Sequence, residues 1–220
     1  MVRILSFDCA NKSLAAVGIE WDDNWRVKYI KELQRIYKLY KGNIHNVQSI
    51  KALYGELCAL EKETYKQWDI KYTLFCDLIP GKKVKDTKPN ERCLALNNKT
   101  KEINRDFPNP DIVLIEDQMT PNEKSRGVFY CLVYEYCNNV VIMDPKKKNT
   151  FNFGAGCLNK YILKYSGAWS ANKAHVRENF KIFLKLIDRE DIIKKYKTIT
   201  DVGDAVFQTI GYTYSVSMPN

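Results

Sequence analysis

The most constraining feature of the sequence is a short continuous apolar run, Ile-Val-Leu-Ile at 112–115, that ends in an acid, Glu116. A strand without polar alternation is buried on both faces, which is typical of parallel sheets covered by helices. Helical patterns flank the run at 91–105 and 122–136, and a second short apolar run follows at 140–143. This order of elements predicts an α/β layer with a mixed sheet.

The N-terminal part adds further elements. We expect strands at 2–7, 14–21, 25–30 and 71–79, and helices at 46–68, 171–187 and 200–214. The first three strands would form an opening β-meander. A basic, turn-rich stretch covers 80–90. We therefore expect one domain over 1–220, with a helical and loop insertion at about 37–90 before the first core helix.

The net charge suggests a polyanionic partner, although many basic proteins bind none. The chain has 35 Lys and Arg against 26 Asp and Glu, a net charge of +9. Two lysine clusters are candidate contacts to phosphate, because a lysine binds phosphate as a point charge without reading base sequence. They are Lys82-Lys83 and Lys146-Lys147-Lys148.

Cysteine and histidine usage excludes several site classes. The seven cysteines are scattered without a C-x-x-C pair, and only two histidines, His45 and His175, are present. A zinc site and a disulfide framework are both unsupported. No apolar run approaches the roughly 20 residues of a membrane span, and the start resembles a strand rather than a signal peptide. We expect an intracellular, reducing compartment and no membrane partner.

Two acids are expected to end neighbouring strands. Asp8 closes the first strand and Glu116 closes the central one. If these strands are adjacent and parallel, both acids emerge at one sheet edge, where open α/β sheets bind ligands. A simple turn role remains the alternative for either acid alone.

Two further acids open the last helix. Asp201 and Asp204 are three residues apart, so they share a helix face in the first turn, after Thr200 as the expected N-cap. Compensation of the helix dipole could explain either acid. It does not explain Gly203 and Ala205, small residues that would let this helix lie tightly against the sheet.

Four clustered carboxylates would need cations. Like charges that lose hydration repel one another unless a cation lies between them. Oxygen ligands favour Mg²⁺ or Mn²⁺ over zinc. Two such ions about 4 Å apart can activate a water and stabilise the leaving oxygen of a phosphodiester, without a histidine or cysteine.

At these residues the chain resembles the RuvC-type Holliday junction resolvases, and among them those of poxviruses and other large DNA viruses. The motifs occur in the family's order: the strand ending in Asp8, the strand ending in Glu116, and the helix opening Asp-Val-Gly-Asp-Ala at 201–205. Lys-Asn-Thr-Phe at 148–151 and Asn-Lys-Ala-His-Val at 172–176 resemble the family's basic segment and the start of its next helix.

The resemblance implies a ribonuclease H-like fold with a mixed five-stranded sheet flanked by helices. It further implies a homodimer that binds branched DNA and resolves four-way junctions by paired symmetric nicks. Asp8, Glu116, Asp201 and Asp204 would hold two Mg²⁺ or Mn²⁺ ions. Two lysines would contact the scissile or a flanking phosphate and stabilise developing charge. They are Lys148 and Lys173. A viral protein of this kind would act in the host-cell cytoplasm or at a replication site.

Some features depart from the family pattern, and other functions stay open. The turn after Asp8 lacks glycine, and Met119 stands where bacterial members carry an aromatic wedge, leaving Phe129 or Tyr130 as alternatives for opening a junction. A nuclease acting on flaps or RNA–DNA hybrids, and a non-catalytic nucleic-acid-binding protein of the same fold, are the remaining alternatives. An actin-like ATPase would need glycine-rich phosphate turns, and the only candidate, at 153–156, lies in the wrong place.

Overall fold

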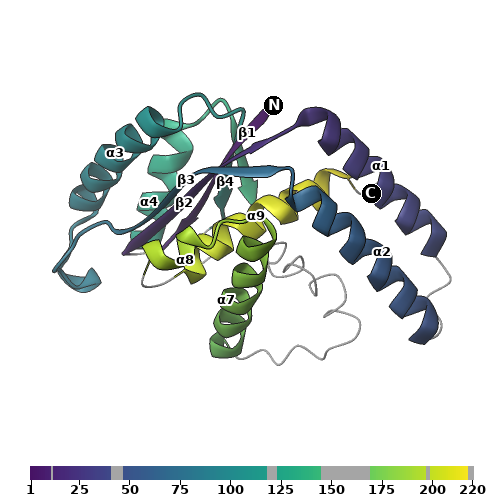
Figure 1. The fold of residues 1–220 in the computed structure, drawn as a ribbon. Coiled ribbons are helices and arrows are strands. Elements are labelled where there is room, and N and C mark those ends of the chain that lie inside the picture. The colour runs from purple at the N-terminus through teal and green to yellow at the C-terminus, as the bar shows by residue number, and fades with distance from the viewer. Residues whose placement is uncertain (11, 41–46, 118–122, 145–168, 197–198, 218–220) are drawn as a thin grey trace.

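A mixed five-stranded sheet forms the centre of the molecule (Figure 1). The computed structural model describes residues 1–10, 12–40, 47–117, 123–144, 169–196 and 199–217. The strands are β1 Val2–Cys9, β2 Ser13–Trp21, β3 Trp68–Asp77, β4 Ile112–Glu116 and β5 Val140–Met143, in the order β3-β2-β1-β4-β5. β1 pairs antiparallel with β2 and parallel with β4, β2 pairs antiparallel with β3, and β4 pairs parallel with β5. The expected sheet, with the first and central strands adjacent and parallel, is confirmed.

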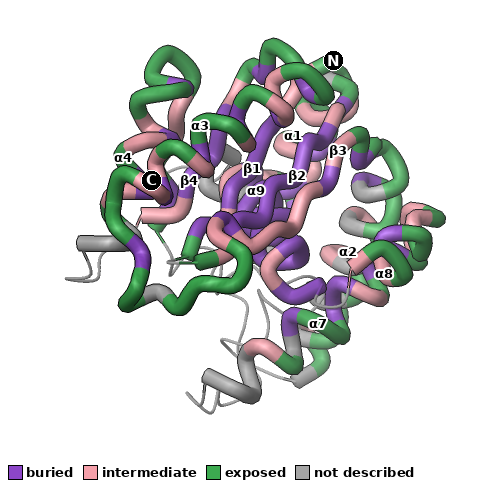
Figure 2. Tube along the Cα trace, turned by 90° about the vertical axis from the view of Figure 1, so that its left-hand side faces the viewer, coloured by how far each residue is buried: buried purple, intermediate pink, exposed green. Residues whose placement is uncertain are grey.

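Helices cover both faces of the sheet. They are α1 Asp23–Tyr40, α2 Val47–Tyr65, α3 Pro89–Asp106, α4 Glu123–Glu135, α7 Trp169–Leu186, α8 Asp191–Lys195 and α9 Thr200–Ser217, with a 3₁₀ turn η1 at Val84–Asp86. α3 and α4 pack on one face, and α9 packs on the other with α7 and α1 outside it. Figure 2 shows burial concentrated in the central strands and α9. No described helix is long and apolar enough to cross a membrane.

The alternation of side chains along β1 and β4 decides which residues reach α9. Leu5 and Phe7 of β1 pack in the core under α3 and α4, together with Val113 and Ile115 of β4. The intervening side chains of each strand point to the opposite face, because successive residues alternate across a sheet. On the α9 side, the last residue of each strand is therefore an acid: Asp8 in β1 and Glu116 in β4.

The expectation of a third meander strand at 25–30 is wrong, because this segment lies within α1. Asp22 Oδ1 accepts a hydrogen bond from the Trp25 backbone N–H at 2.8 Å, which starts the helix. Tyr29 and Leu33 are four residues apart and both buried, so they form one helical stripe against the core. Aromatic and β-branched content in a short window indicated a strand, but the longer helical period determines the structure.

The range 37–90 contains α2, β3 and η1. β3 is a strand of the central sheet, so the residues that separate β2 from β3 are mainly the helical pair α1 and α2. Arg35 of α1 is ion-paired with Glu56 of α2 at 2.9 Å, which joins the two helices. Whether this range is an insertion relative to related proteins stays a prediction.

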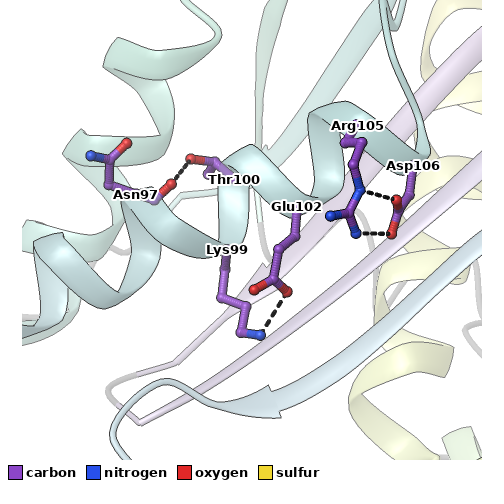
Figure 3. Close-up of polar contacts among 6 residues, drawn as sticks. All are labelled: Asn97, Lys99, Thr100, Glu102, Arg105 and Asp106. Atoms are coloured by element: carbon purple, nitrogen blue, oxygen red, sulfur yellow. Dashed lines mark hydrogen bonds and ion pairs between the residues drawn. The ribbon is translucent and has the colours of Figure 1, made fainter.

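The outer surface of α3 is a solvated helix face with mutually paired charges (Figure 3). Lys99 Nζ lies 2.7 Å from Glu102 Oε2, and Arg105 Nε lies 2.8 Å from Asp106 Oδ1. Because these charges pair with each other, this face contributes little net field toward a polyanion.

Candidate metal centre

Two parallel strands end side by side at the first part of the site. The last paired residues of β1 and β4 are Phe7 and Ile115, so Asp8 and Glu116 occupy the next position on adjacent strands. Neighbouring strands are about 4.8 Å apart, and paired residues of parallel strands project to the same face. Asp8 and Glu116 therefore both project from the strand ends toward the α9 side.

The first turn of α9 supplies two more carboxylates. Thr200 is the first residue of α9, where the sequence had suggested an N-cap just before the helix. The side chain of Asp204 is only 5% exposed and that of Asp201 is 24% exposed. Val202 and Ala205 are fully buried in the core beneath. Burial of these neighbours holds the start of α9 against the sheet, so both acids lie at its edge.

Gly203 has a different role from the expected one. A Cβ at this position would lie 3.0 Å from Cγ of Phe180, a residue of α7. The glycine thus allows α7 and α9 to approach closely, rather than α9 and the sheet. This close approach matters for the site, because α7 carries Lys173.

The three aspartates converge. Asp8, Asp201 and Asp204 each place a carboxylate oxygen within 4.8 Å of the others, although they come from elements nearly two hundred residues apart along the chain. Glu116 is adjacent to Asp8 in the sheet but lies outside this group. The sequence had predicted all four acids in one pocket, and the structure brings three of them together with the fourth on the neighbouring strand.

Lys173 provides the positive charge at this centre. Its Nζ lies 3.0 Å from Asp201 Oδ1 and 2.6 Å from Asp204 Oδ2. Burial of the Lys173 ammonium lowers its pKa, but the charges of Asp204 and Asp201 and the hydrogen bonds to them outweigh this, and the pKa is raised overall. The amine therefore stays protonated at neutral pH and neutralises part of the acidic cluster.

This arrangement fits a divalent cation. Three carboxylates at such separations form an all-oxygen ligand set, which suits Mg²⁺ or Mn²⁺. The three carboxylates, of which only Asp204 is buried, already have one cation in contact with two of them, the Lys173 ammonium. Asp8, Asp201 and Asp204 are thus the residues that would hold a metal, and Glu116 lies on the strand next to Asp8.

The predicted phosphate-binding lysines have mixed outcomes. Lys146, Lys147 and Lys148 lie outside the described residues, as does Met119. Lys82 and Lys83 are exposed on the connection between β3 and α3, and Lys82 is ion-paired with Glu91 at 2.9 Å. Strand pairing places the end of β3 at the same sheet edge as the end of β1. The connection carrying these lysines thus starts at the edge that holds the aspartates.

Phe129 and Tyr130, the two alternatives for a side chain that opens a junction, differ in exposure. Phe129 is buried under the sheet in the core formed with α3 and α4, so it has a structural role. Tyr130 is exposed on the same helix.

Sequence reasoning missed one buried polar residue beside the site. Gln208 lies four positions after Asp204 in α9 and is fully buried, with its Nε2 donating to the carbonyl oxygen of Phe7 at 3.4 Å. The available signal was a polar residue on the buried face of an otherwise apolar helix, one turn below an expected metal ligand.

Comparison with known proteins identifies the fold. No protein-family model and no curated protein sequence matches the chain. Among solved structures, a fowlpox virus resolvase in complex with Holliday junction DNA is similar with a TM-score of 0.54 at 15% identity, covering 98% of this chain and 99% of that one. A second structure, of the fowlpox virus Holliday junction resolvase, gives 0.53 at 13% identity with the same coverage.

RuvC of Thermus thermophilus is also similar, with a TM-score of 0.52 at 10% identity and 98% of each chain covered. Coverage is near-complete in both directions, so the likeness extends over the described elements from β1 to α9 and is not limited to one motif. The chain has the ribonuclease H-like fold of the RuvC-type proteins. At these identities the likeness establishes the fold alone.

Proposed function

We propose that this chain is a metal-dependent, structure-selective DNA endonuclease that resolves four-way junctions by paired symmetric nicks. The observation that carries the proposal is the convergence of Asp8, Asp201 and Asp204 within 4.8 Å on this fold. The sheet edge at which they meet is where α/β sheets bind ligands. Three solved structures of similar fold are Holliday junction resolvases or RuvC by name.

Each residue of the centre has a role in this proposal. Asp8, Asp201 and Asp204, with Glu116 beside Asp8, would hold two Mg²⁺ or Mn²⁺ ions. When bound, such ions supply a nucleophilic water and stabilise the leaving oxygen of a phosphodiester. Without bound metal ions, the Lys173 ammonium neutralises part of the charge of Asp201 and Asp204. Its side chain is 31% exposed, so its flexible stem allows the ammonium to turn toward a phosphate oxygen of bound DNA.

Branched DNA is the proposed partner. One of the similar structures is a fowlpox virus resolvase with Holliday junction DNA, and the net charge of +9 favours a polyanion for this chain too. Lys82 and Lys83 lie on the connection that begins at the same sheet edge as the acids, and they would contact backbone phosphates. Lys146, Lys147 and Lys148 extend this expectation to the segment after β5, with Lys148 reaching the scissile or a flanking phosphate.

Paired nicks on two strands require two active sites, so the proposal includes a homodimer. Leu94, Tyr130 and Tyr134 are exposed apolar side chains around a groove between α3 and α4, on the face opposite α9. Exposed apolar patches of this kind support a protein contact. Tyr134→Glu should shift the chain toward a monomer in analytical ultracentrifugation. Ile182→Glu, an equally drastic change at another exposed apolar residue on α7, should leave the mass unchanged.

The test of function compares substrates and variants. The full chain is incubated in Mg²⁺ with a labelled four-way junction, a linear duplex of the same sequence, and an RNA–DNA hybrid. We expect symmetric nicks in the junction only, and their loss in Asp8→Asn and Asp204→Asn. Asp188→Asn is the matched control, because Asp188 is an exposed acid at the end of α7, away from the cluster.

Other outcomes select other functions. Equal cleavage of all three substrates would reject junction selectivity and leave a nuclease of broader substrate choice, and preference for the hybrid would indicate a ribonuclease. Junction binding without cleavage in both Mg²⁺ and Mn²⁺ would support a non-catalytic nucleic-acid-binding protein and reject the endonuclease.

A further inference from the structure

Gln208 connects the two halves of the metal centre. It is fully buried between α9 and β1, one helical turn beyond Asp204. Its Nε2 donates to the carbonyl oxygen of Phe7, the residue that precedes Asp8. One side chain therefore joins the helix that carries Asp201 and Asp204 to the backbone that carries Asp8.

Stability alone does not account for a glutamine at this position. Within the described part of the chain, Gln208 Oε1 is buried and accepts no hydrogen bond, and the buried Ser6 Oγ on β1 has no partner either. A buried polar atom without a partner lowers stability, and a 3.4 Å hydrogen bond is too long to offset much of that loss. A methionine has similar length and would fill the same space without this penalty.

Unlike an apolar residue, Gln208 adds a directional contact between α9 and β1. Much of the contact between α9 and the sheet is apolar and involves residues such as Val206 and Ile210. Apolar packing is non-directional, so it allows small shifts of the helix along the strand. The hydrogen bond from Gln208 to the Phe7 carbonyl is directional, so it favours one position of α9 along β1.

We infer that Gln208 is a positioning residue that sets the separation of Asp8 from Asp201 and Asp204. The inference rests on the proposed function, because it concerns the same metal site. Mg²⁺ requires ligand distances of about 2.0–2.1 Å and near-octahedral geometry, so a small displacement of α9 weakens binding. Residues that orient metal ligands from outside the coordination sphere typically change affinity by about 10- to 100-fold.

The test measures metal binding without DNA. Mn²⁺ is titrated into the full chain, and the free ion is followed by electron paramagnetic resonance. Gln208→Met should bind Mn²⁺ about 10-fold more weakly than the unsubstituted chain, at the lower end of the range for such residues. Its melting temperature without metal should be equal or higher, because a partnerless polar atom is removed. Gln208→Leu provides a second apolar variant with the same expected weakening.

Thr209→Val is the matched control. Thr209 is as buried as Gln208 and adjacent to it, but its hydroxyl donates to the Ala205 carbonyl of the same helix at 3.3 Å. Its removal disturbs α9 without releasing β1, so Mn²⁺ affinity should not change.

The outcomes separate the inference from the proposed function. Unchanged affinity in both Gln208 variants, with binding abolished in Asp8→Asn, would overturn the inference and leave the metal site standing. Equal weakening in Thr209→Val would also overturn it, since any disturbance of α9 would then suffice. Absence of Mn²⁺ binding by the unsubstituted chain would overturn both.

Discussion

Replacement of Lys173 by methionine should destabilise the metal-free protein and increase its response to divalent metal. In the structure the Lys173 ammonium contacts Asp201 and Asp204 at 3.0 and 2.6 Å, and its side chain is 31% exposed. Breaking a buried ion pair from one side costs about 3–5 kcal/mol, and partial exposure reduces this to about 2–3 kcal/mol. For a chain of this size, that corresponds to a fall in melting temperature of about 4–12 °C.

The pH range for this measurement follows from the sign of the pKa shift. The pKa of Lys173 is raised in the folded protein above the ordinary value of 10.5. The stabilisation is therefore present in full below 10.5 and is lost only as pH rises through the higher folded-state value. Neutral pH lies well below both values, so thermal unfolding followed by circular dichroism at neutral pH measures the whole effect.

Added Mg²⁺ should raise the melting temperature of Lys173→Met more than that of the unsubstituted chain, because the ion no longer competes with the ammonium. Lys181→Met is the control, since Lys181 lies on the same helix and pairs with Glu178 at 3.0 Å on the surface. An exposed pair of this kind contributes about 0–1 kcal/mol. Equal melting temperatures for the two variants without metal would refute the assignment of Lys173 as the internal cation of the cluster.

Two further predictions concern the opposite face of the sheet. A Cβ at Gly18 would lie 2.7 Å from the Phe107 ring, so Gly18→Ala should lower the free energy of unfolding, measured in urea, by about 1–3 kcal/mol. Gly127 on α4 has open space around it, so the control Gly127→Ala should raise the free energy of unfolding by up to about 1 kcal/mol. An unchanged free energy of unfolding in Gly18→Ala would contradict the close packing. The thiols of Cys93 and Cys131 lie 3.0 Å apart, and burial together with the hydrogen bond to Cys93 raises the pKa of Cys131 to about 11. Oxidised glutathione should therefore form a disulfide between them, faster at higher pH. This disulfide should add about 3–4 kcal/mol of stability, which dithiothreitol should remove. An unchanged melting temperature after oxidation would contradict this prediction.

The strand-end acids were predictable because sheet topology constrains them strongly. A continuous apolar run that ends in Glu116 must be buried, and a parallel neighbour ending in Asp8 then brings both acids to one edge. Asp201 and Asp204 share a helix face through their spacing alone. These inferences need only local pattern and the rules for strand order, on the condition that the first and central strands are adjacent and parallel, which the structure shows.

The segment at 25–30 was mispredicted for a local reason. Its residues have high strand propensity, and propensity over six residues cannot override a helical stripe that extends to Leu33 and Ile36. The contacts of Lys173 and Gln208 could not be predicted in detail, because they depend on how α7 and α9 approach each other and the sheet. That approach is set by tertiary packing, such as the contact of Gly203 with Phe180.

The charge of the centre limits how Lys173 can act. In the proposed function, the four carboxylates of Asp8, Asp201, Asp204 and Glu116 would balance the charge of two divalent cations, so an ammonium held among them would leave an excess of positive charge in a partly buried site. A DNA phosphate would bring the compensating negative charge to the same place. Since the lysine stem is flexible and partly exposed, the proposed function requires the ammonium to leave Asp201 and Asp204 and to contact the phosphate when metal and DNA are both bound. Lys173 would then move between the two charge partners, and Lys173→Met should lose cleavage of a bound junction while retaining, or improving, its affinity for Mn²⁺.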